Sequence, residues 1–267
     1  MSMRRSNWHD LPPAARAAVE HHVGPVKEAM TVPAGANSGI AALVHASDGA
    51  VFIKGVPVDH PQARTQDREA AINPHLPAAC PRLLGRVRAA GWDLIVYEHL
   101  DARHATYAPG SLDLPAVADA IEELQAVRCP DGLHVKDAAQ RWATYADDAD
   151  TAPLQGDALL HTDLAPHNVL ITDRAHLIDW AWPTRGAAWI DPAVLVLRLM
   201  EAGHSAREAD IFARRFPSWS TVPRHAVEVF SVANARTWEE IARHDPQHWK
   251  KRMAQLAHAW VDYWRVG

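Results

Sequence analysis

The pattern of hydrophobic and polar positions changes its period several times in the first hundred residues. Apolar residues at helical spacing follow two prolines and stop at Gly24, and a second helical stretch, 67–73, stops at Pro74. Both predict helices, because proline is tolerated in a first helical turn and ends a helix further along. Residues 35–56 and 82–100 each hold two β-rich runs joined by a turn signal. We therefore expect a small, mostly antiparallel sheet with a helix packed on it.

The spacing of apolar residues becomes mainly helical in the rest of the chain. Residues 113–127 predict an amphipathic helix with Asp113 as its N-cap and a proline in the first turn. Everything after Asp191 also predicts helix. A capping-box spacing begins at Ser205, and residues 246–266 predict one long helix at the C-terminal end.

Length and composition limit the class of protein. The 267 residues are enough for two lobes with a sizeable core, and the change of pattern predicts a small lobe over residues 1–99 and a larger helical lobe over residues 100–267. Apolar residues make up 48% and charged residues 22%, as is usual for a soluble globular protein. A net charge of -5 argues against a nucleic-acid-binding protein, which usually carries a basic excess.

Cysteine usage and the longest apolar runs indicate the compartment. The two cysteines, Cys80 and Cys129, do not make a disulfide scaffold, so a reducing cytosol fits better. The arginines near the N-terminus are not followed by the apolar region of a signal peptide. No apolar run approaches the length of a membrane span. We expect a cytoplasmic protein that has neither a membrane nor a nucleic acid as its partner.

Candidate chemistry gathers in residues 159–180, LLHTDLAPHNVLITDRAHLIDW, where polar side chains stand at the ends of strand-like apolar runs. Buried carboxylates are unfavourable unless something pairs with them. Mg²⁺ bound to nucleotide phosphates prefers hard oxygen ligands, and Asn168 and Asp179 lie at the two ends of a predicted hairpin, so both could reach such a metal. Asp163 could accept a hydroxyl proton, and His161 could orient the loop. The pattern predicts a metal–phosphate cluster among these residues.

The spacing His161-x-Asp163-x-x-x-x-Asn168, followed by an Ile-Asp-Trp run at Asp179, resembles the catalytic loop and metal-binding segment of the aminoglycoside phosphotransferase family. The resemblance implies an α+β, protein-kinase-like two-lobe fold, with a small antiparallel-sheet N-lobe and a larger, mostly helical C-lobe. It implies ATP as phosphate donor, Asp163 as catalytic base, and Asn168 and Asp179 as Mg²⁺ ligands. Asp191 resembles the family's Asp that braces the catalytic loop, and it also fits a plain helix N-cap.

The sheet-rich lobe offers a lysine for the nucleotide phosphates. Lys54 lies between apolar residues in the second run of the first predicted hairpin, where a kinase needs a strand lysine. Glu69, in the next predicted helix, could pair with Lys54 and fix its direction, and Asp67 is a rival for this role.

Two further segments would contact the nucleotide if the resemblance holds. The turn at residues 35–39, GANSG, would face the phosphates, with Ser38 as a contact. Residues 97–100 fall where the family's hinge would lie, and the backbone of Glu98 and Leu100 would bind the adenine edge there.

The phosphate acceptor is expected to be a small molecule with a hydroxyl group. In this family it is often an aminoglycoside or another cationic antibiotic, which would imply antibiotic resistance; relatives phosphorylate choline, sugars or amino alcohols. Acidic and aromatic side chains of the C-terminal helices are candidates for binding a cationic acceptor, although each one singly is more often a solvated charge or a core aromatic. They are Glu201, Asp210, Glu228, Glu239, Glu240 and Asp262, with Trp219, Trp238 and Trp260 nearby in sequence.

Two other functions remain open at this point. His161, Asp163 and His167 could bind zinc in a hydrolase, since imidazole and carboxylate are suitable ligands. That function leaves Lys54, Asn168 and Asp179 without a role. A nucleotide-binding scaffold without activity is the second alternative, and the presence of every catalytic group argues against it.

Overall fold

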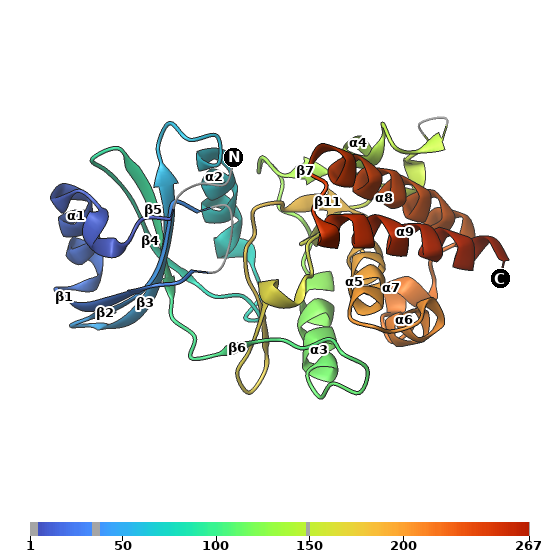
Figure 1. Cartoon of the computed structure of the whole chain (residues 1–267), viewed down its shortest axis with the longest axis horizontal. Coiled ribbons are helices and arrows are strands. Elements are labelled where there is room, and N and C mark those ends of the chain that lie inside the picture. Colours follow the sequence, from blue (N-terminus) through green and yellow to red (C-terminus); the bar gives the residue numbers. More distant parts are fainter. Residues whose placement is uncertain (1–4, 34–37, 148–149, 267) are drawn as a thin grey trace. The chain divides into compact units, whose positions relative to one another are not determined.

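The computed structural model describes residues 5–33, 38–147 and 150–266, and the chain forms two compact units. The first unit is Met1–Asp101 together with Asp179–Ala181. The second unit is Ala102–Ile178 together with Trp182–Gly267. The N-terminal part holds an antiparallel sheet and the C-terminal part is mainly helical (Figure 1). These features confirm the predicted α+β class.

The first unit is built on one five-stranded sheet with the order β1-β2-β3-β5-β4, in which all neighbouring strands are antiparallel. Both predicted hairpins are present, with Ala46 paired to Gly49 at the first turn and Ala89 paired to Trp92 at the second. The elements are α1 (Pro13–Val23), β1 (Val26–Thr31), β2 (Ile40–Ala46), β3 (Gly49–Pro57), α2 (Ala63–Ile72), β4 (Leu83–Ala89) and β5 (Trp92–Glu98).

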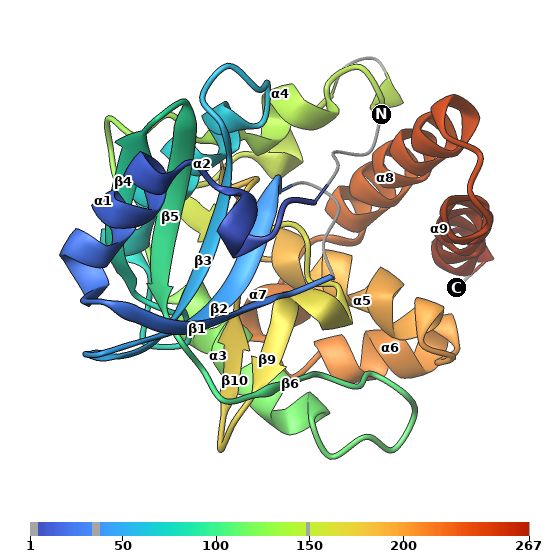
Figure 2. The same cartoon turned by 60° about the vertical axis from the view of Figure 1, so that its left-hand side comes forward.

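Strand β3 separates the two faces of this sheet by simple alternation, because successive side chains of a strand point to opposite sides. Val51 and Ile53 are buried in the same apolar cluster as Val19 and Val23 of α1. Lys54 points to the opposite face, where its ammonium contacts an acid of α2. The two helices therefore cover opposite faces of the sheet, as Figures 1 and 2 show.

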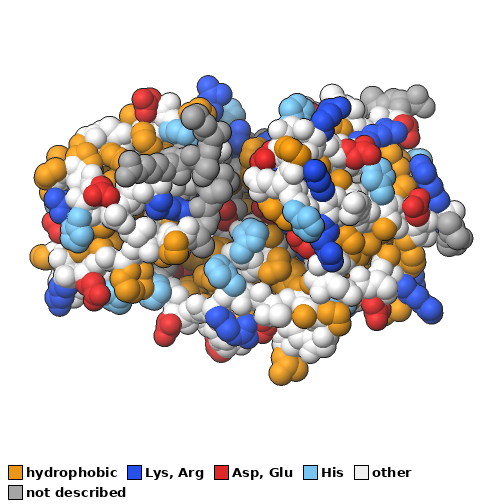
Figure 3. Space-filling view, in the orientation of Figure 1, with side chains coloured by type: hydrophobic (Ala, Val, Ile, Leu, Met, Phe, Trp, Pro, Cys, Tyr) orange, Lys and Arg blue, Asp and Glu red, His pale blue; other side chains and the backbone are white. Residues whose placement is uncertain are grey.

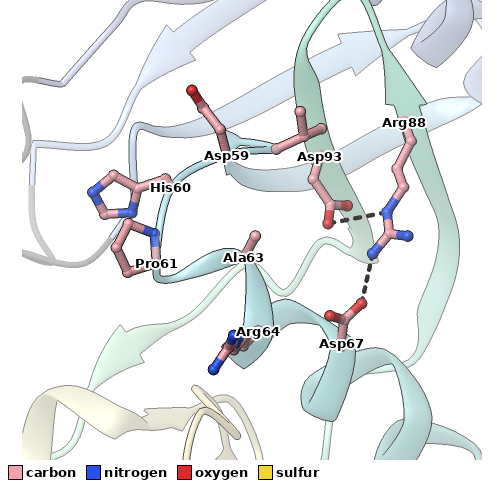
Figure 4. A pocket seen from close by; sticks show the side chains of 9 residues that line it. Asp59, His60, Pro61, Ala63, Arg64, Asp67, Arg88 and Asp93 are labelled. Carbon is pink, nitrogen blue, oxygen red and sulfur yellow. Dashed lines mark hydrogen bonds and ion pairs between the residues drawn. The ribbon is translucent and has the colours of Figure 1, made fainter.

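A network of charges fixes α2 against β4 and β5. The buried carboxylate of Asp93 accepts hydrogen bonds from Arg86 (2.8 Å) and Arg88 (3.2 Å). Both arginines also contact Asp67 of α2, at 2.7 and 2.5 Å. Three of these side chains line one side of a hollow of ≈ 620 Å³ (Figure 4). Since Asp67 is engaged here, it is not the acid that meets Lys54.

The second unit packs its helices around two small three-stranded sheets, with the orders β10-β9-β6 and β7-β11-β8. Its helices are α3 (Leu114–Gln125), α4 (Ala138–Trp142), α5 (Ile190–Glu201), α6 (Ala206–Ala213), α7 (Pro217–Ser220), α8 (Arg224–His244) and α9 (His248–Val266). Its strands are β6 (Arg103–His104), β7 (Lys136–Asp137), β8 (Ala158–Leu160), β9 (Val169–Ile171), β10 (Ala175–Leu177) and β11 (Thr184–Gly186).

Aromatic side chains fill much of the core of this unit. Trp260 is fully buried, with its ring stacked on Trp219 and packed edge-on against Phe230. Trp189 and Trp142 also pack against Phe230. Trp219 and Trp260 are therefore core residues, which accounts for part of the high tryptophan content.

Two predicted helix caps were tested by the structure, with different outcomes. Ser205 and Glu208 form the expected capping box at the start of α6. Asp113 precedes α3 as predicted, but its side chain makes no cap hydrogen bond. The carboxylate of Asp113 instead accepts two hydrogen bonds from the guanidinium of Arg103, at 2.6 and 2.7 Å, which form a bidentate, charge-assisted pair.

In the described part of the chain, no helix is both long and apolar enough to cross a membrane.

Candidate active site

The first unit brings together a lysine and two acids that are distant in sequence. Lys54 Nζ lies 2.5 Å from Glu69 Oε2 of α2 and 3.0 Å from Asp179 Oδ1. The hydroxyl of Tyr97, on the neighbouring strand β5, donates to Glu69 at 3.1 Å. Of the two acids weighed for Lys54, Glu69 is thus the one in contact. The lysine is oriented by a helix on one side and by Asp179 on the other.

Burial and charge act in opposite directions in this cluster. Burial alone would lower the pKa of Lys54, but the carboxylates of Asp179 and Glu69 outweigh it, so the pKa is raised and the ammonium stays charged. Burial also raises the pKa of Glu69, and Lys54 offsets only part of that rise. Glu69 is 3% exposed whereas Asp179 is 43% exposed. Asp179 is therefore the acid of this group that can also reach a ligand in solution.

Two residues of the candidate site have a left-handed backbone although neither is glycine. Thr162 has a φ of 64° and Asp179 a φ of 65°. Such conformations are uncommon outside glycine, asparagine and aspartate, and they persist where the surrounding structure enforces them. Thr162 lies next to Asp163 and Asp179 is the middle residue of the Ile-Asp-Trp run, so both segments are functional candidates.

The loop after β8 is held by a buried carboxylate. Asp191, in the first turn of α5, accepts hydrogen bonds from the backbone N–H groups of His161 and Thr162, both at 2.8 Å. Burial raises the pKa of Asp191 more than these two donors lower it. The side chain does not cap α5, because the residue before that helix is Trp189. The N-cap interpretation of Asp191 is therefore wrong, and its contacts are those of a brace.

The ring of His161 connects the loop after β8 with the segment that follows β10. Its Nε2 lies 2.9 Å from the carbonyl oxygen of Ile178, and its Nδ1 accepts from the N–H of Asp163 at 3.2 Å. A neutral ring with the proton on Nε2 satisfies both contacts. Both nitrogens are thus engaged with the backbone, which argues against the zinc-ligand role weighed for His161. The described residues contain no group of three or more His, Cys, Asp or Glu that could hold a metal ion.

Asn168 closes the loop from its other end. It ends a short 3₁₀ helix, Pro166–Asn168, and its Nδ2 donates to the carbonyl oxygen of Asp163 at 3.0 Å. The N–H of Ile178 donates to the carbonyl oxygen of Asn168 at 2.9 Å, and Asp179 is the next residue in the chain. With the amide nitrogen engaged, Oδ1 is the Asn168 atom that suits a hard cation.

Arg198 contacts the carboxylate of Asp163, and sequence analysis did not single it out. Its Nη2 lies 2.9 Å from Asp163 Oδ1, and its Nη1 lies 2.9 Å from Glu201. Its guanidinium also lies over the ring of Trp238, 5.5 Å from the centroid. Arg198 is 10% exposed and Asp163 is 37% exposed. A fixed arginine therefore orients Asp163 while leaving part of the carboxylate accessible.

Arg141 of α4 supports the same loop and was also missed. Its Nη1 donates to the hydroxyl groups of Thr162 (2.6 Å) and Thr184 (3.2 Å). Burial lowers the pKa of Arg141 to about 10, although Asp163 and Asp191 act against that shift. No motif near Arg141 in the sequence signals this contact, because it depends on how α4 packs.

The remaining sequence candidates belong to the first unit. Residues 35–37 of the GANSG turn lie outside the described residues, while Ser38 is half-buried just before β2. Glu98 ends β5, and its carboxylate binds the backbone N–H and the side chain of Arg82 at 2.8 and 3.1 Å. Leu100 follows in the segment that leads out of this unit. The proposed roles of Ser38, Glu98 and Leu100 in nucleotide binding stay predictions.

Comparison with solved structures identifies the class of fold. The arrangement of an antiparallel sheet followed by a mainly helical part is that of the protein-kinase-like phosphotransferases, as the resemblance predicted. Choline kinase LicA from Streptococcus pneumoniae matches with a TM-score of 0.61 and 12% identity, over 93% of this chain and 99% of that chain. A thermostable mutant of aminoglycoside phosphotransferase APH(4)-Ia, in a ternary complex with ADP and hygromycin B, matches with a TM-score of 0.57 and 16% identity, over 90% of this chain and 97% of that chain. No family model and no curated protein matches the sequence.

Proposed function

We propose that the protein is an ATP- and magnesium-dependent phosphotransferase that acts on a hydroxyl group of a small molecule. The observation that carries this proposal is the meeting of Lys54 with Glu69 and with Asp179, which is 125 residues away in the sequence. Protein kinases need a strand lysine paired with a helix glutamate, and an aspartate for the metal. The similar structures include a choline kinase and an aminoglycoside phosphotransferase bound to ADP, which supports the same chemistry.

Asp163 is the group that we assign to the acceptor. The carboxylate orients the attacking hydroxyl and takes its proton as the phosphoryl group is transferred. Its position is fixed by Arg198, by the Asn168 side chain on its carbonyl oxygen, and by Asp191 on the preceding backbone. Most of the rate enhancement then comes from positioning and from fixed charges, which need no reorganisation during the reaction.

The donor side of the reaction uses the cluster of the first unit. Lys54 binds the nucleotide phosphates with its charged ammonium, and Glu69 keeps it aimed. The exposed carboxylate of Asp179 and the amide oxygen of Asn168 are hard oxygen donors, and they fit magnesium, which takes one or two carboxylates and keeps part of its water shell. When bound there, magnesium neutralises charge on the phosphates. Cys80 and Cys129 are buried and are not joined in a disulfide, which suits the reducing cytosol that supplies ATP.

A panel of hydroxylated compounds tests the proposed function. Purified protein is mixed with ATP, with and without Mg²⁺, and ADP release is measured for sugars, polyols, choline, amino alcohols and aminoglycosides. We expect at least one compound to stimulate ADP release in a Mg²⁺-dependent manner. If no compound becomes phosphorylated and the purified protein contains stoichiometric zinc, the result would instead favour a hydrolase.

Replacing Asp179 by alanine tests the metal assignment. We expect the Mg²⁺ concentration needed for half-maximal ADP release to rise about 10-fold or more, the scale seen when even a supporting residue of a metal site is removed. A Mg²⁺ titration at fixed ATP measures it. An unchanged titration curve would remove Asp179 from the metal site. The matched control is Asp173→Ala, which changes an exposed aspartate in the turn between β9 and β10.

A further inference from the structure

Arg198 is a buried cation that two carboxylates of the second unit share. Its Nη2 lies 2.9 Å from Asp163 Oδ1, and its Nη1 lies 2.9 Å from Glu201 Oε2. The arginine side chain is 10% exposed, whereas those of Asp163 and Glu201 are 37% and 29% exposed. The planar guanidinium has its donors in a rigid arrangement, so it fixes the direction of a carboxylate that it binds.

The face of this guanidinium lies on an aromatic ring. Its central carbon is 5.5 Å from the centroid of the Trp238 ring. Trp238 in turn packs against an apolar cluster that contains Leu197 of α5 and Met253 of α9. A cation over the face of a tryptophan ring is stabilised, and more strongly where water is excluded. Trp238 and Glu201 therefore hold Arg198 from two directions.

The two carboxylate oxygens of Asp163 differ in what they contact. Oδ1 accepts from Arg198, and among the described residues Oδ2 has no hydrogen-bond partner. The backbone of Asp163 is held separately, because its N–H donates to His161 and its carbonyl oxygen accepts from Asn168. With the main chain and Oδ1 both fixed, the carboxylate cannot turn freely, and Oδ2 is the oxygen left to meet an acceptor hydroxyl.

No other cation can take over from Arg198. Arg141 and Asp191 lie at the same loop, but Arg141 donates to threonine hydroxyls and Asp191 accepts from backbone N–H groups. In the described part of the chain, Arg198 is the one cation that forms an ion pair with Asp163. The three acids here, Asp163, Glu201 and Asp191, outnumber the two arginines. Loss of Arg198 would therefore leave Asp163 and Glu201 to repel each other.

Glu201 has a position that its contact with Arg198 explains. It is the last residue of α5, one turn after Arg198, so the two side chains share a face of the helix. An acid in the last turn of a helix is disfavoured by the helix dipole, and here the arginine offsets that cost.

Glu201 and Trp238 also fit the other role considered from the sequence, the binding of a cationic acceptor. A cation that approached Glu201 would compete with a guanidinium that already lies 2.9 Å from Oε2. On the face of the second unit that Figure 3 shows, acidic and basic side chains are interspersed and form no acidic patch. Both observations favour a role within the protein for Glu201.

Resting on the proposed function, we propose that Arg198, Glu201 and Trp238 position Asp163 for catalysis, so that Oδ2 takes the proton of the acceptor hydroxyl. The acceptor oxygen bonds to the γ-phosphorus, the bond from that phosphorus to the ADP oxygen breaks, and the acceptor proton passes to Oδ2. Arg198, Glu201 and Trp238 are positioning residues, because none of them touches the acceptor. They act on the rate of transfer, since a displacement of about 1 Å can lower a rate about 10²-fold.

Glu201→Gln is the main test, because it removes the charge that anchors Arg198 and keeps the size of the side chain. For a compound that stimulates ADP release, we expect kcat to fall about 10-fold, the difference between a charge-assisted and a neutral hydrogen bond. The KM for the acceptor and the KM for ATP should be unchanged. A rise in acceptor KM at unchanged kcat is the result expected of an acceptor-binding acid, and it would overturn the proposal.

The matched control makes the same change in another glutamate–arginine pair of the second unit. Glu122, on α3, lies 3.5 Å from Arg215, and Glu122→Gln should leave kcat unchanged. Trp238→Leu removes the ring beneath the guanidinium and keeps an apolar side chain. We expect it to lower kcat about 3-fold, as the loss of an exposed cation–π contact would. A kcat for Glu201→Gln equal to that of the control would show that Glu201 does not act on Asp163.

Double variants decide whether Glu201 acts through Arg198. Arg198→Met should lower kcat about 10²-fold, and in that background Glu201→Gln should cause no further loss, because the group that it anchors is gone. Arg198→Lys keeps the charge but not the planar fork, so it should recover part of the lost rate. If the losses of Arg198→Met and Glu201→Gln multiply, Glu201 acts independently and the proposal is wrong.

A measurement of stability needs no acceptor and separates this proposal from the proposed function. Free energies of unfolding in urea are compared for Arg198→Met, Asp163→Asn and the double variant. We expect the two effects to be non-additive, as for residues in contact, and additive effects would show that the pair does not hold Asp163. If no compound stimulates ADP release, the phosphotransferase itself is contradicted and the catalytic role of these residues with it, whatever the coupling.

Discussion

Replacing Asp163 by alanine should reduce phosphoryl transfer by about 10²–10⁴-fold, the contribution typical of a positioned acid–base group, while ATP still binds. The reason lies in the separate placement of the two sets of groups. Lys54, Glu69 and Asp179 belong to the first unit, and Asp163 belongs to the second, where it contacts Arg198. The rate is measured as acceptor-dependent ADP release, and nucleotide binding by calorimetry or by displacement of a fluorescent ATP analogue.

Two further variants make this result specific. Asp163→Asn keeps the size of the side chain but cannot take a proton, so we expect a loss of rate close to that of alanine. Asp173→Ala, in an exposed turn of the same hairpin, should retain full activity. If Asp163→Ala loses nucleotide binding together with activity, the residue has a structural or donor-binding role and the assignment as acceptor base is wrong.

Replacing Lys54 by methionine should have the largest effect on stability, because it leaves Glu69 buried without its cation. Removing one partner of a buried ion pair typically lowers the free energy of unfolding by about 3–5 kcal/mol. Glu69 already has a raised pKa from burial, and Lys54 is the group that limits this rise. Methionine of similar length preserves the packing, so the loss reports the missing charge. Activity should also fall to background, since no other lysine of this cluster can bind the phosphates.

The loss of stability in Lys54→Met should depend on pH, because the pKa of Glu69 is raised in the folded protein. A carboxyl group with a raised pKa in the folded state favours the folded state when it is protonated, so its contribution is lost as pH rises above the ordinary glutamate value of about 4.3 and through the raised pKa. We expect the free energy of unfolding of Lys54→Met, measured in urea from pH 5 to pH 8, to fall with rising pH relative to the unchanged protein.

Two controls complete the series. The double variant Lys54→Met/Glu69→Gln should lose most of this pH dependence and recover part of the stability, because no buried charge remains. Lys27→Met changes an exposed lysine of β1 and should leave the free energy of unfolding nearly unchanged. If the free energies of unfolding of Lys54→Met and of the unchanged protein differ by the same amount at every pH from 5 to 8, the assignment of Lys54 and Glu69 as a buried ion pair is wrong.

Sequence patterns predicted those parts of the fold that depend on neighbours in the chain. Helix α1 ends at Gly24, whose φ of 77° suits glycine, and the hairpin turns lie where Gly49 and Gly91 stand. Strand β1 was not predicted, because its alternation is weak: VKEAMT has exposed or half-buried positions throughout. Helix α2 begins at Ala63, earlier than the apolar spacing indicated, since its first turn is polar.

The same distinction holds for the candidate site: contacts between neighbours in the chain could be predicted, and contacts between distant segments could not. His161, Asp163 and Asn168 lie within one loop, so their spacing alone predicted their proximity. Arg198 and Arg141 reach that loop from 35 and 21 residues away, through the packing of α5 and α4.

The left-handed backbone of Thr162 has a consequence for attempts to make this protein more heat-resistant. Glycine would relieve the strain at this position, of the order of 1 kcal/mol, but it would also remove the hydroxyl that Arg141 holds. Selection for thermal stability would therefore favour glycine at this position, whereas selection for activity would favour threonine. Measuring both the thermal stability and the activity of variants at position 162 would show how much stability is lost to keep the catalytic loop in its active conformation.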